Sequence, residues 1–179
     1  MCMCWRRCRR VWFEAAFMCL FCITQTITLL VIANGAPVLI SKALSNRYAW
    51  PVDNSLKLRD GHRLFGDTKT WRGLCSAIFF TTLAAILSGI EPMTGVLFGT
   101  SAMVGDLLAS FIKRRMGYIE SSRARGLDTV PESLLPILLL KKQLALSLID
   151  IILVVAIFFL IEEFISPVLY RLHIRKRPY

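Results

Sequence analysis

The sequence predicts an all-α, polytopic integral membrane protein with about five transmembrane helices and two cytoplasmic polar loops. Hydrophobic residues make up 55% of the 179 residues, and the mean hydropathy is +0.57. Several apolar stretches approach the roughly 20 residues that cross a bilayer core. Lysine and arginine gather in two polar segments, as the positive-inside rule describes for cytoplasmic loops.

The apolar stretches place the whole chain, residues 1–179, in a single membrane domain. A soluble fold of this size has no room to bury four such helices. The first stretch is expected to end where Asn34-Gly35-Ala36-Pro37 interrupts it, because proline removes a backbone donor. The expected helices are Val11–Ala33, Leu74–Ile90, Met93–Ile112, Pro131–Leu140 and Leu144–Ile161.

The fourth stretch is too short to cross a bilayer alone, because ten helical residues rise about 15 Å. It either extends into Gln143–Leu148, with Lys141 and Lys142 snorkelling, or forms a half-helix. Five crossings put the C-terminus inside the cell and the N-terminus outside. The four arginines between residues 6 and 10 argue against that side for the N-terminus. The apolar stretch that follows them is longer than a signal-peptide core, so we expect it to be retained.

The cations sit in the polar segments. The first cytoplasmic loop, about residues 45–72, holds seven Lys and Arg with its flanks, and the second, about residues 113–129, holds five. The basic C-terminal tail, residues 165–179, holds four, and the turn between the second and third helices holds none. This distribution explains the net charge of +10 without a separate basic module, so nucleic acid is not an expected partner.

The first polar loop carries residues suited to phosphate. Glycines let backbone N–H groups approach an anion closely, and lysine and arginine bind phosphate oxygens. The segment fits a nucleoside triphosphate at the membrane surface, although it is not a P-loop. Its alternative role is a solvated basic loop that only sets topology. The candidate nucleotide- and phosphate-binding residues are Arg63, Asp67, Thr68, Lys69, Thr70 and Arg72.

The third helix contains an ionisable residue within its apolar run. Asp106, Ser110 and Lys113 are spaced by four and three residues, which places them on one helical face. A carboxylate at this depth costs about 2.5–3.5 kcal/mol on insertion scales, so such residues usually have a function. The alternative is a salt bridge or hydrogen bond between helices.

The second loop ends at two carboxylates, Asp128 and Glu132, that share a face if a helix starts there. Two anions this close favour a hard cation such as magnesium. The alternative, compatible with the first, is that Asp128 or Thr129 caps the helix, with Pro131 in its first turn.

The cysteines and histidines do not match a zinc site or a hydrolytic triad. None of the six cysteines has the spacing of a zinc site. His62 and His173 have no partners for a hydrolytic triad.

These segments together resemble the CDP-archaeol synthase family, relatives of the phosphatidate cytidylyltransferases. The specific stretches are the Gly-Asp-x-Lys-Thr-x-Arg-Gly run ending at Gly73 and the Gly-Asp-x-x-x-Ser-Phe-x-Lys-Arg-Arg run starting at Gly105. Weaker likeness covers Asn34–Val38, Pro51–Asp53 and Leu127–Pro136. The pattern departs after Asp128, where the family has a second aspartate three residues on. Here that position is Pro131, and Glu132 follows it.

The resemblance implies a CTP-dependent cytidylyltransferase that converts a membrane lipid phosphate, archaetidic acid-like or phosphatidate, to a CDP-lipid and pyrophosphate with Mg²⁺. The implied partners are CTP, the lipid phosphate and membrane lipids. The enzyme would be integral to the cell membrane, with its active site facing the cytoplasm. The attacking phosphate is already largely dianionic at pH 7, so no general base is required. The implied catalytic residues are Asp106, Ser110, Lys113 and Arg114, and the implied metal ligands are Asp106, Asp128 and Glu132.

Two other classes fit the composition. A small transporter or channel could use Asp106 and Asp150 as ion-pathway carboxylates, but the polar residues concentrate in two loops on one side. A structural or assembly protein is the second alternative. The Asp-Gly-x-x-Ala-Arg signature of the CDP-alcohol phosphotransferases is absent.

Overall fold

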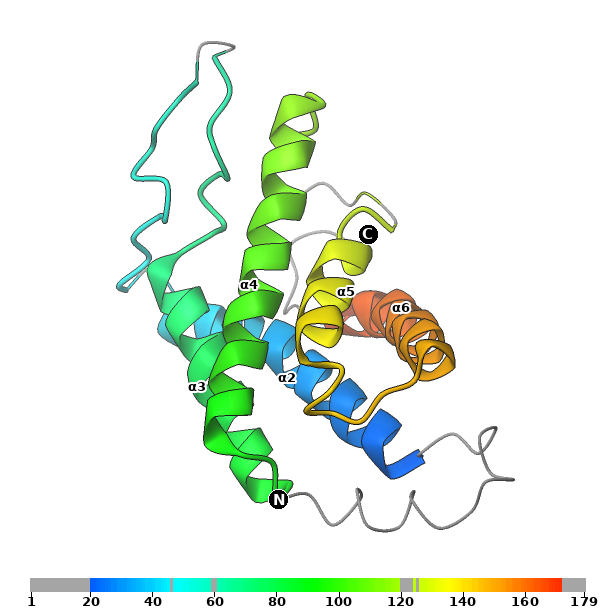
Figure 1. The fold of residues 1–179 in the computed structure, drawn as a ribbon. Helices are drawn as coiled ribbons and strands as arrows, with labels where there is room; N and C mark the ends of the chain where they lie inside the picture. The colour runs from blue at the N-terminus through cyan, green and yellow to red at the C-terminus, as the bar shows by residue number, and fades with distance from the viewer. Residues whose placement is uncertain (1–19, 46, 59–60, 120–123, 125, 172–179) are drawn as a thin grey trace, which may run out of the picture.

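The computed structural model is all-helical over the residues it describes, which are 20–45, 47–58, 61–119, 124 and 126–171 (Figure 1). The prediction of an all-α fold is confirmed. Helix α4 runs through the middle of the molecule, with α3 and α5 packed along it, while α2 crosses behind and α6 packs on α5 and α2 (Figure 1). The helices are α2 (Leu20–Leu44), α3 (Trp71–Leu87), α4 (Pro92–Arg115), α5 (Thr129–Leu140) and α6 (Leu148–Arg171).

Large apolar side chains cover the outside of this helical bundle. Helices α2 and α4 are each long and apolar enough to cross a bilayer, and α3 and α5 are shorter apolar helices of 17 and 12 residues. An outward apolar surface on several helices is what lipid contact requires and what a water-soluble protein avoids. Exposed examples are Leu39, Phe79, Leu87, Leu97, Leu108, Ile152 and Leu160.

The expected end of the first helix at Ala33 is wrong. Helix α2 continues through Asn34-Gly35-Ala36-Pro37 to Leu44. A proline inside a helix removes only one backbone hydrogen bond, and packed neighbouring helices allow the helix to continue past it. The part of the predicted span before Leu20, with its arginines, lies outside the described residues.

Helix α5 is a half-helix in length. Its 12 residues rise about 18 Å, and the helix ends at Leu140. Of the two predicted alternatives, the half-helix is therefore confirmed in length, and the extension into Gln143–Leu148 is wrong. Helix α6 starts at Leu148 because Ser147 and Asp150 cap it reciprocally: the Ser147 N–H donates to Asp150 Oδ2 at 2.9 Å and the Asp150 N–H donates to Ser147 Oγ at 3.2 Å.

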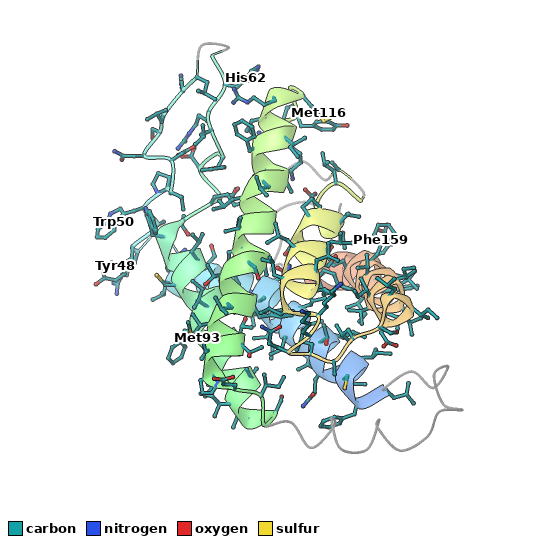
Figure 2. The ribbon with its side chains drawn as sticks, in the orientation of Figure 1. Tyr48, Trp50, His62, Met93, Met116 and Phe159 are labelled. Atoms are coloured by element: carbon teal, nitrogen blue, oxygen red, sulfur yellow. The ribbon has the colours of Figure 1, made fainter. Side chains whose placement is uncertain are left out.

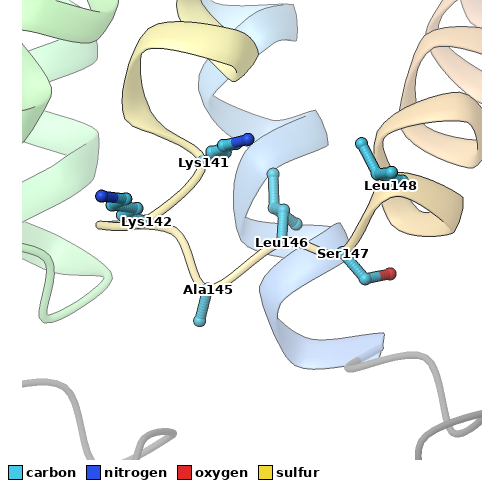
Figure 3. Close-up of a pocket in the computed structure, with 6 residues that line it drawn as sticks. All are labelled: Lys141, Lys142, Ala145, Leu146, Ser147 and Leu148. Carbon is cyan, nitrogen blue, oxygen red and sulfur yellow. The ribbon is translucent and has the colours of Figure 1, made fainter.

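An open recess of about 680 Å³ lies at this turn (Figure 3). It is at the opposite end of α5 from Asp128 and Glu132, so it is separate from the candidate site described below. The lining residues are Lys141, Lys142, Ala145, Leu146, Ser147 and Leu148.

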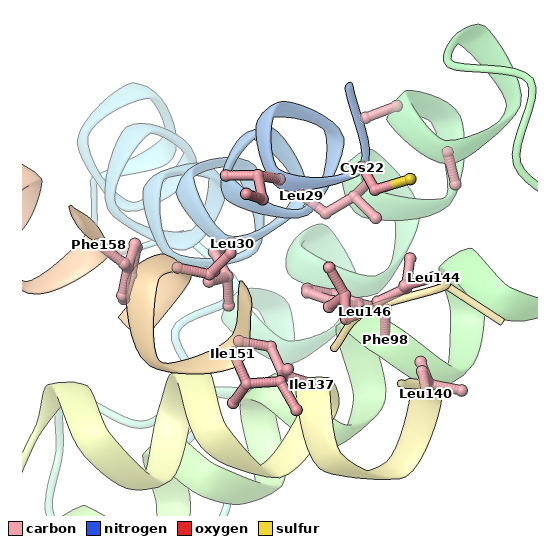
Figure 4. Close-up of a cluster of buried hydrophobic side chains, with 14 residues drawn as sticks. Cys22, Leu29, Leu30, Phe98, Ile137, Leu140, Leu144, Leu146, Ile151 and Phe158 are labelled. Atoms are coloured by element: carbon pink, nitrogen blue, oxygen red, sulfur yellow. The ribbon is translucent and has the colours of Figure 1, made fainter. Parts of the chain in front are cut away.

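The buried apolar cluster joins α2, α3, α4, α5 and α6 (Figure 4). Lipid tails are as apolar as these side chains, so close packing rather than removal from water stabilises the contacts within a bilayer. The fully buried members include Leu29, Leu30, Phe98, Ile137, Val154 and Phe158.

Glycines on α4 allow its neighbours to approach closely. A Cβ at Gly95 would lie 2.9 Å from Thr82 Cα, and one at Gly99 would lie 3.0 Å from Ile78 Cα, both on α3. On the other side, a Cβ at Gly105 would clash with the backbone of α5, lying 2.7 Å from the carbonyl carbon of Pro131. The start of α5 therefore contacts α4 directly beside Asp106.

A polar hairpin, residues 50–70, connects α2 to α3 and is organised by Asp53. The buried carboxylate accepts hydrogen bonds from Arg63 Nη2 at 2.7 Å and from the N–H groups of Phe65 at 3.2 Å and Gly66 at 3.0 Å. Burial raises the pKa of Asp53, but the bonds to Arg63 and the backbone outweigh it and lower the pKa to about 2. Asp53 is therefore a charged anchor of the hairpin at neutral pH.

The second arm of the hairpin is attached to the end of α4. Arg115 Nη2 donates to the carbonyl oxygen of Arg63 at 2.7 Å and weakly to that of His62 at 3.4 Å. His62 consequently lies beside the end of α4 near Met116 (Figure 2). The two polar segments predicted from the sequence thus meet at one end of the bundle.

Replacing Gly105 by alanine should separate α4 from α5, because the added methyl group overlaps the backbone of Pro131 and Glu132. We expect Gly105→Ala to lower the thermal unfolding temperature in detergent, with a cost of about 1–3 kcal/mol for overpacking. Gly35→Ala is the matched control, because a Cβ at Gly35 meets no atom within 4 Å. Equal stability of the two variants would contradict the close contact.

Candidate active site

Two lysine–carboxylate pairs, each with one member on α4, lie at the end of the bundle where the polar segments meet. Lys69 Nζ donates to both carboxylate oxygens of Asp106, at 2.6 and 2.5 Å. Lys113 Nζ lies 2.7 Å from Asp128 Oδ1. Asp106 and Lys113 are seven residues, or about two turns, apart on α4. The two pairs therefore bring together α4, the hairpin and the segment before α5.

Lys69 is held in its charged form. Burial by itself lowers the pKa of the Lys69 ammonium, but the charge of Asp106 and the hydrogen bonds to it more than compensate and raise the pKa. Lys69 precedes Thr70, whose Oγ1 accepts from the Gly73 N–H at 3.2 Å and caps α3. The cap fixes the start of α3 and with it the point from which Lys69 reaches Asp106.

Glu132 is a buried carboxylate beside these pairs. It is 7% exposed, forms no hydrogen bond with any other residue in the described part of the chain, and interacts electrostatically with Asp106, Lys69 and Asp128. The contact of Gly105 with the Glu132 backbone explains its position, because Gly105 is the neighbour of Asp106 on α4. An unpaired carboxylate in such surroundings favours a cation.

Glu162 on α6 is a fourth carboxylate that the sequence analysis missed. Its Oε2 accepts a hydrogen bond from Thr129 Oγ1, at the start of α5, at 2.5 Å. It also interacts electrostatically with Glu132. The predicted last helix ended at Ile161, whereas α6 continues to Arg171. A glutamate directly after an apolar run was the available signal.

Asp128 occupies the N-cap position of α5 without capping it. Its side chain makes no capping hydrogen bond, so that alternative is wrong for Asp128. The carboxylate instead pairs with Lys113 and accepts from the Ala124 N–H at 3.2 Å. Asp128 therefore ties the second polar segment to α4.

The residues that could hold a metal are the carboxylates of this cluster. All-oxygen donors of this kind suit magnesium. As they stand, no three Asp, Glu, His or Cys side chains in the described ranges lie close enough together to hold an ion. Lys69 pairs with Asp106 and Lys113 pairs with Asp128 in this structure.

The other predicted catalytic residues are on the same helix end. Ser110 is buried one turn after Asp106. Arg114 is also buried, and its Nη2 donates to the carbonyl oxygen of Ile119 at 3.1 Å, while its Nε has no partner in the described part of the chain. Both lie within the α4 segment between Asp106 and Arg115.

Several predicted nucleotide-binding residues have other partners in this structure. Arg63 pairs with Asp53 and with the exposed Asp67 inside the hairpin. Arg72 donates to the carbonyl oxygens of Ser45 and Arg47, which fastens the end of α2 to α3. Thr68 is exposed. Of that predicted set, the structure places Lys69 in contact with Asp106.

Asp150 is remote from this cluster. It lies in the first turn of α6, 12 residues before Glu162, or about 18 Å along the helix. A pathway through Asp106 and Asp150 therefore gains no support from the geometry.

Comparison with known proteins identifies the family. A family described as CarS-like, CDP-archaeol synthase, matches residues 9–179. The CDP-archaeol synthase of Sulfolobus acidocaldarius is 34% identical over 155 residues, covering 83% of this chain and 91% of that protein. The CDP-archaeol synthase of Sulfurisphaera tokodaii is 30% identical over 157 residues, covering 83% and 90%.

A solved structure agrees with the fold. It belongs to an intramembrane enzyme for archaeal membrane lipid biosynthesis, and it superimposes with a TM-score of 0.58 at 26% identity, covering 75% of this chain and 88% of that one. The outward apolar surface, the polar cluster at α4 and the extent of these matches all indicate one family of membrane enzymes. The chain belongs to the CDP-archaeol synthase family of integral membrane enzymes.

Proposed function

We propose that the protein transfers the cytidylyl group of CTP to a membrane lipid phosphate, forming a CDP-lipid and pyrophosphate. The observation that carries this is the pair of lysines, Lys69 and Lys113, held on carboxylates of one cluster at the polar end of an apolar bundle. A soluble triphosphate and a lipid phosphate can meet only at such a boundary. The names of the relatives support the same reaction.

The reaction needs charge neutralisation more than proton transfer. A lipid phosphate oxygen attacks the α-phosphorus of CTP, a new P–O bond forms, and the bond to the β-phosphate oxygen breaks as pyrophosphate leaves. The nucleophile is already ionised near pH 7, so no base is required. Anion repulsion is the main barrier, and fixed cations lower it.

The lysine–carboxylate pairs provide a way to supply those cations. Lys69 and Lys113 can exchange their carboxylate partners for phosphate oxygens when the substrates bind. The exchange leaves Asp106 and Asp128, with Glu132 beside them, as oxygen donors for Mg²⁺. Bound magnesium would neutralise the triphosphate and the leaving pyrophosphate. Once they hold the phosphates, the lysines need little further reorganisation during the transfer step, which favours rapid transfer.

The active site faces the cytoplasm in this proposal, because CTP is a cytoplasmic nucleotide and the lysine-rich segments favour that side. The bond of Arg115 on α4 to the hairpin supports placing both polar segments on one side. The chain would then cross the bilayer five times through α2–α6. Helix α5 would span only the half of the bilayer that is farther from the cytoplasm.

A single cysteine at Ser55 tests this orientation, because Ser55 is exposed on the hairpin. In a variant lacking the native cysteines, Ser55→Cys should resist a membrane-impermeant thiol reagent in intact cells and react after permeabilisation. A second single-cysteine variant, Ser147→Cys, is exposed at the opposite end. It should react with the reagent in intact cells without permeabilisation. Labelling of Ser55→Cys in intact cells would overturn the orientation.

The activity test uses purified protein, CTP, Mg²⁺ and either phosphatidate or an ether-linked isoprenoid glycerol phosphate. We expect release of pyrophosphate and formation of a CDP-lipid with at least one of them. Lys69→Ala should chiefly raise the KM for CTP, and Asp106→Asn should chiefly lower kcat, by about 10²–10³ as for other preorganised charges. Lys142→Ala, at the far end of α5, should leave both constants unchanged. Failure of both lipids, where a known cytidylyltransferase succeeds, would refute the proposed reaction.

Magnesium binding is tested at Asp128. Asp128→Asn removes a proposed ligand and the partner of Lys113, so kcat should fall by on the order of 10²-fold, and higher magnesium should restore it only partly. Glu91→Gln, which changes an exposed carboxylate at the opposite end of α4, should keep the wild-type magnesium dependence. Wild-type turnover of Asp128→Asn at low magnesium would exclude Asp128 as a ligand.

A further inference from the structure

The side chain of Asn34 lies on the inward side of α2 without a partner. Its Nδ2 and Oδ1 atoms are both buried and have no hydrogen bond within the described part of the chain. On the same side of α2, Leu30 is fully buried one turn earlier. Pro37, one turn later, has its Cβ 3.6 Å from the Cβ position of Gly73 on α3. The unpaired amide therefore faces the bundle and not the lipid.

The helix around Asn34 also lacks one regular backbone hydrogen bond. Pro37 has no N–H, so the carbonyl oxygen of the buried Ala33 lacks its usual helical donor. A buried amide can make up to four hydrogen bonds, and leaving them unmade in a bilayer is costly. The other amide of α2, Gln25, is paired, because its Nε2 donates to the Ser88 carbonyl oxygen at 2.7 Å. Asn34 thus differs from Gln25 in lacking a protein partner.

Asn34 lies further along α2 from the polar hairpin than Pro37 does. It is ten residues, or about 15 Å, before the end of α2 at Leu44. The contact of Pro37 with Gly73 joins this face of α2 to the start of α3, four residues after Lys69.

The position selects one part of the substrates. The triphosphate of CTP carries its charge to the lysines and the polar segments, whereas a lipid phosphate extends from that level into the bundle. Directly below its phosphate the lipid has a glycerol unit with ether or ester oxygens, which accept hydrogen bonds but carry no charge. A neutral amide donor on the inward side of α2, beyond the start of α3 from the polar hairpin, matches such an acceptor.

We propose that Asn34 binds the glycerol oxygens of the lipid phosphate, with Nδ2 as the donor. This inference rests on the proposed function and assigns a lipid-binding residue to it. Ether and ester lipids both offer the acceptor, so Asn34 recognises the glycerol unit and not the type of chain linkage.

The test is Asn34→Leu, which keeps the approximate shape and removes the hydrogen bonds. The KM for the lipid phosphate should rise about tenfold, as expected for loss of one or two hydrogen bonds, and the KM for CTP should stay within twofold. Without substrates the variant should unfold at the wild-type temperature or higher, because no protein hydrogen bond is lost. Stabilisation of the protein by the lipid phosphate should shrink, while stabilisation by CTP should persist.

The matched control is Gln25→Leu, which removes the paired amide of the same helix. It should lower the unfolding temperature and leave both KM values unchanged. Asn34→Gln, which retains an amide but displaces it, should show a smaller rise in the lipid KM and serves as the second variant if Asn34→Leu does not fold.

Three results would overturn the inference. An unchanged lipid KM in Asn34→Leu would exclude the contact. A rise in the CTP KM instead would assign the amide to the nucleotide. A lower unfolding temperature with both KM values unchanged would assign it to a structural water. Absence of CDP-lipid formation by the wild-type protein would refute the proposed function itself, whereas an active wild type with an unaffected variant would refute only the role of Asn34.

Discussion

The charge of Asp106 inside an apolar helix is the constraint around which the rest of the structure is arranged. A carboxylate about 13 Å from the end of α4 requires a counter-charge, because isolated ions are costly in such surroundings. Lys69 supplies it from outside the bundle, with its ammonium 2.5–2.6 Å from both oxygens. The hairpin must therefore be held against the bundle. Arg115 on α4 does so by donating to the carbonyl oxygen of Arg63, while Asp53 holds the hairpin together internally.

The close approach of α5 to α4 is the second requirement of the cluster. Gly105 has no side chain to keep the backbone of Pro131 and Glu132 away. The Glu132 carboxylate therefore lies close enough to interact with Asp106. Helix α5 starts beside Gly105 and not at the end of α4. It therefore needs only 12 residues to reach the turn at the far end of the bundle. The space above its first turn is then available to polar groups, including Asp128 and Lys113.

The balance of charge in the cluster suits a reaction between anions. Each lysine is paired with a carboxylate, and Glu132 is left without a hydrogen-bond partner among the described residues. Fixed lysines can accept phosphate groups, and the released carboxylates can accept a divalent cation. Exchange of partners would therefore keep both lysines, Asp106 and Asp128 paired before and after the substrates enter.

The sequence by itself determined the membrane class, the all-helical fold and most of the cluster. Hydrophobic length and cation placement are local properties, so the helices containing Asp106 and Asp128 were found to within a few residues. Helical spacing also placed Ser110 and Lys113 on the face of Asp106. The continuation of α2 past Pro37 could not be predicted, because it depends on neighbouring helices that tolerate one lost hydrogen bond.

Only the tertiary structure decided which charges become partners. Lys69 and Arg72 look alike as phosphate ligands in sequence, yet Lys69 reaches Asp106 and Arg72 fastens the end of α2. Arg63 also looks like a phosphate ligand in sequence, yet it forms an ion pair with Asp53. Glu162 joins the cluster from a helix whose end was misplaced, and Asn34 remains unpaired because no neighbour reaches it. Sequence spacing describes one helix at a time, whereas pairing between helices depends on close contacts such as that of Gly105 with α5.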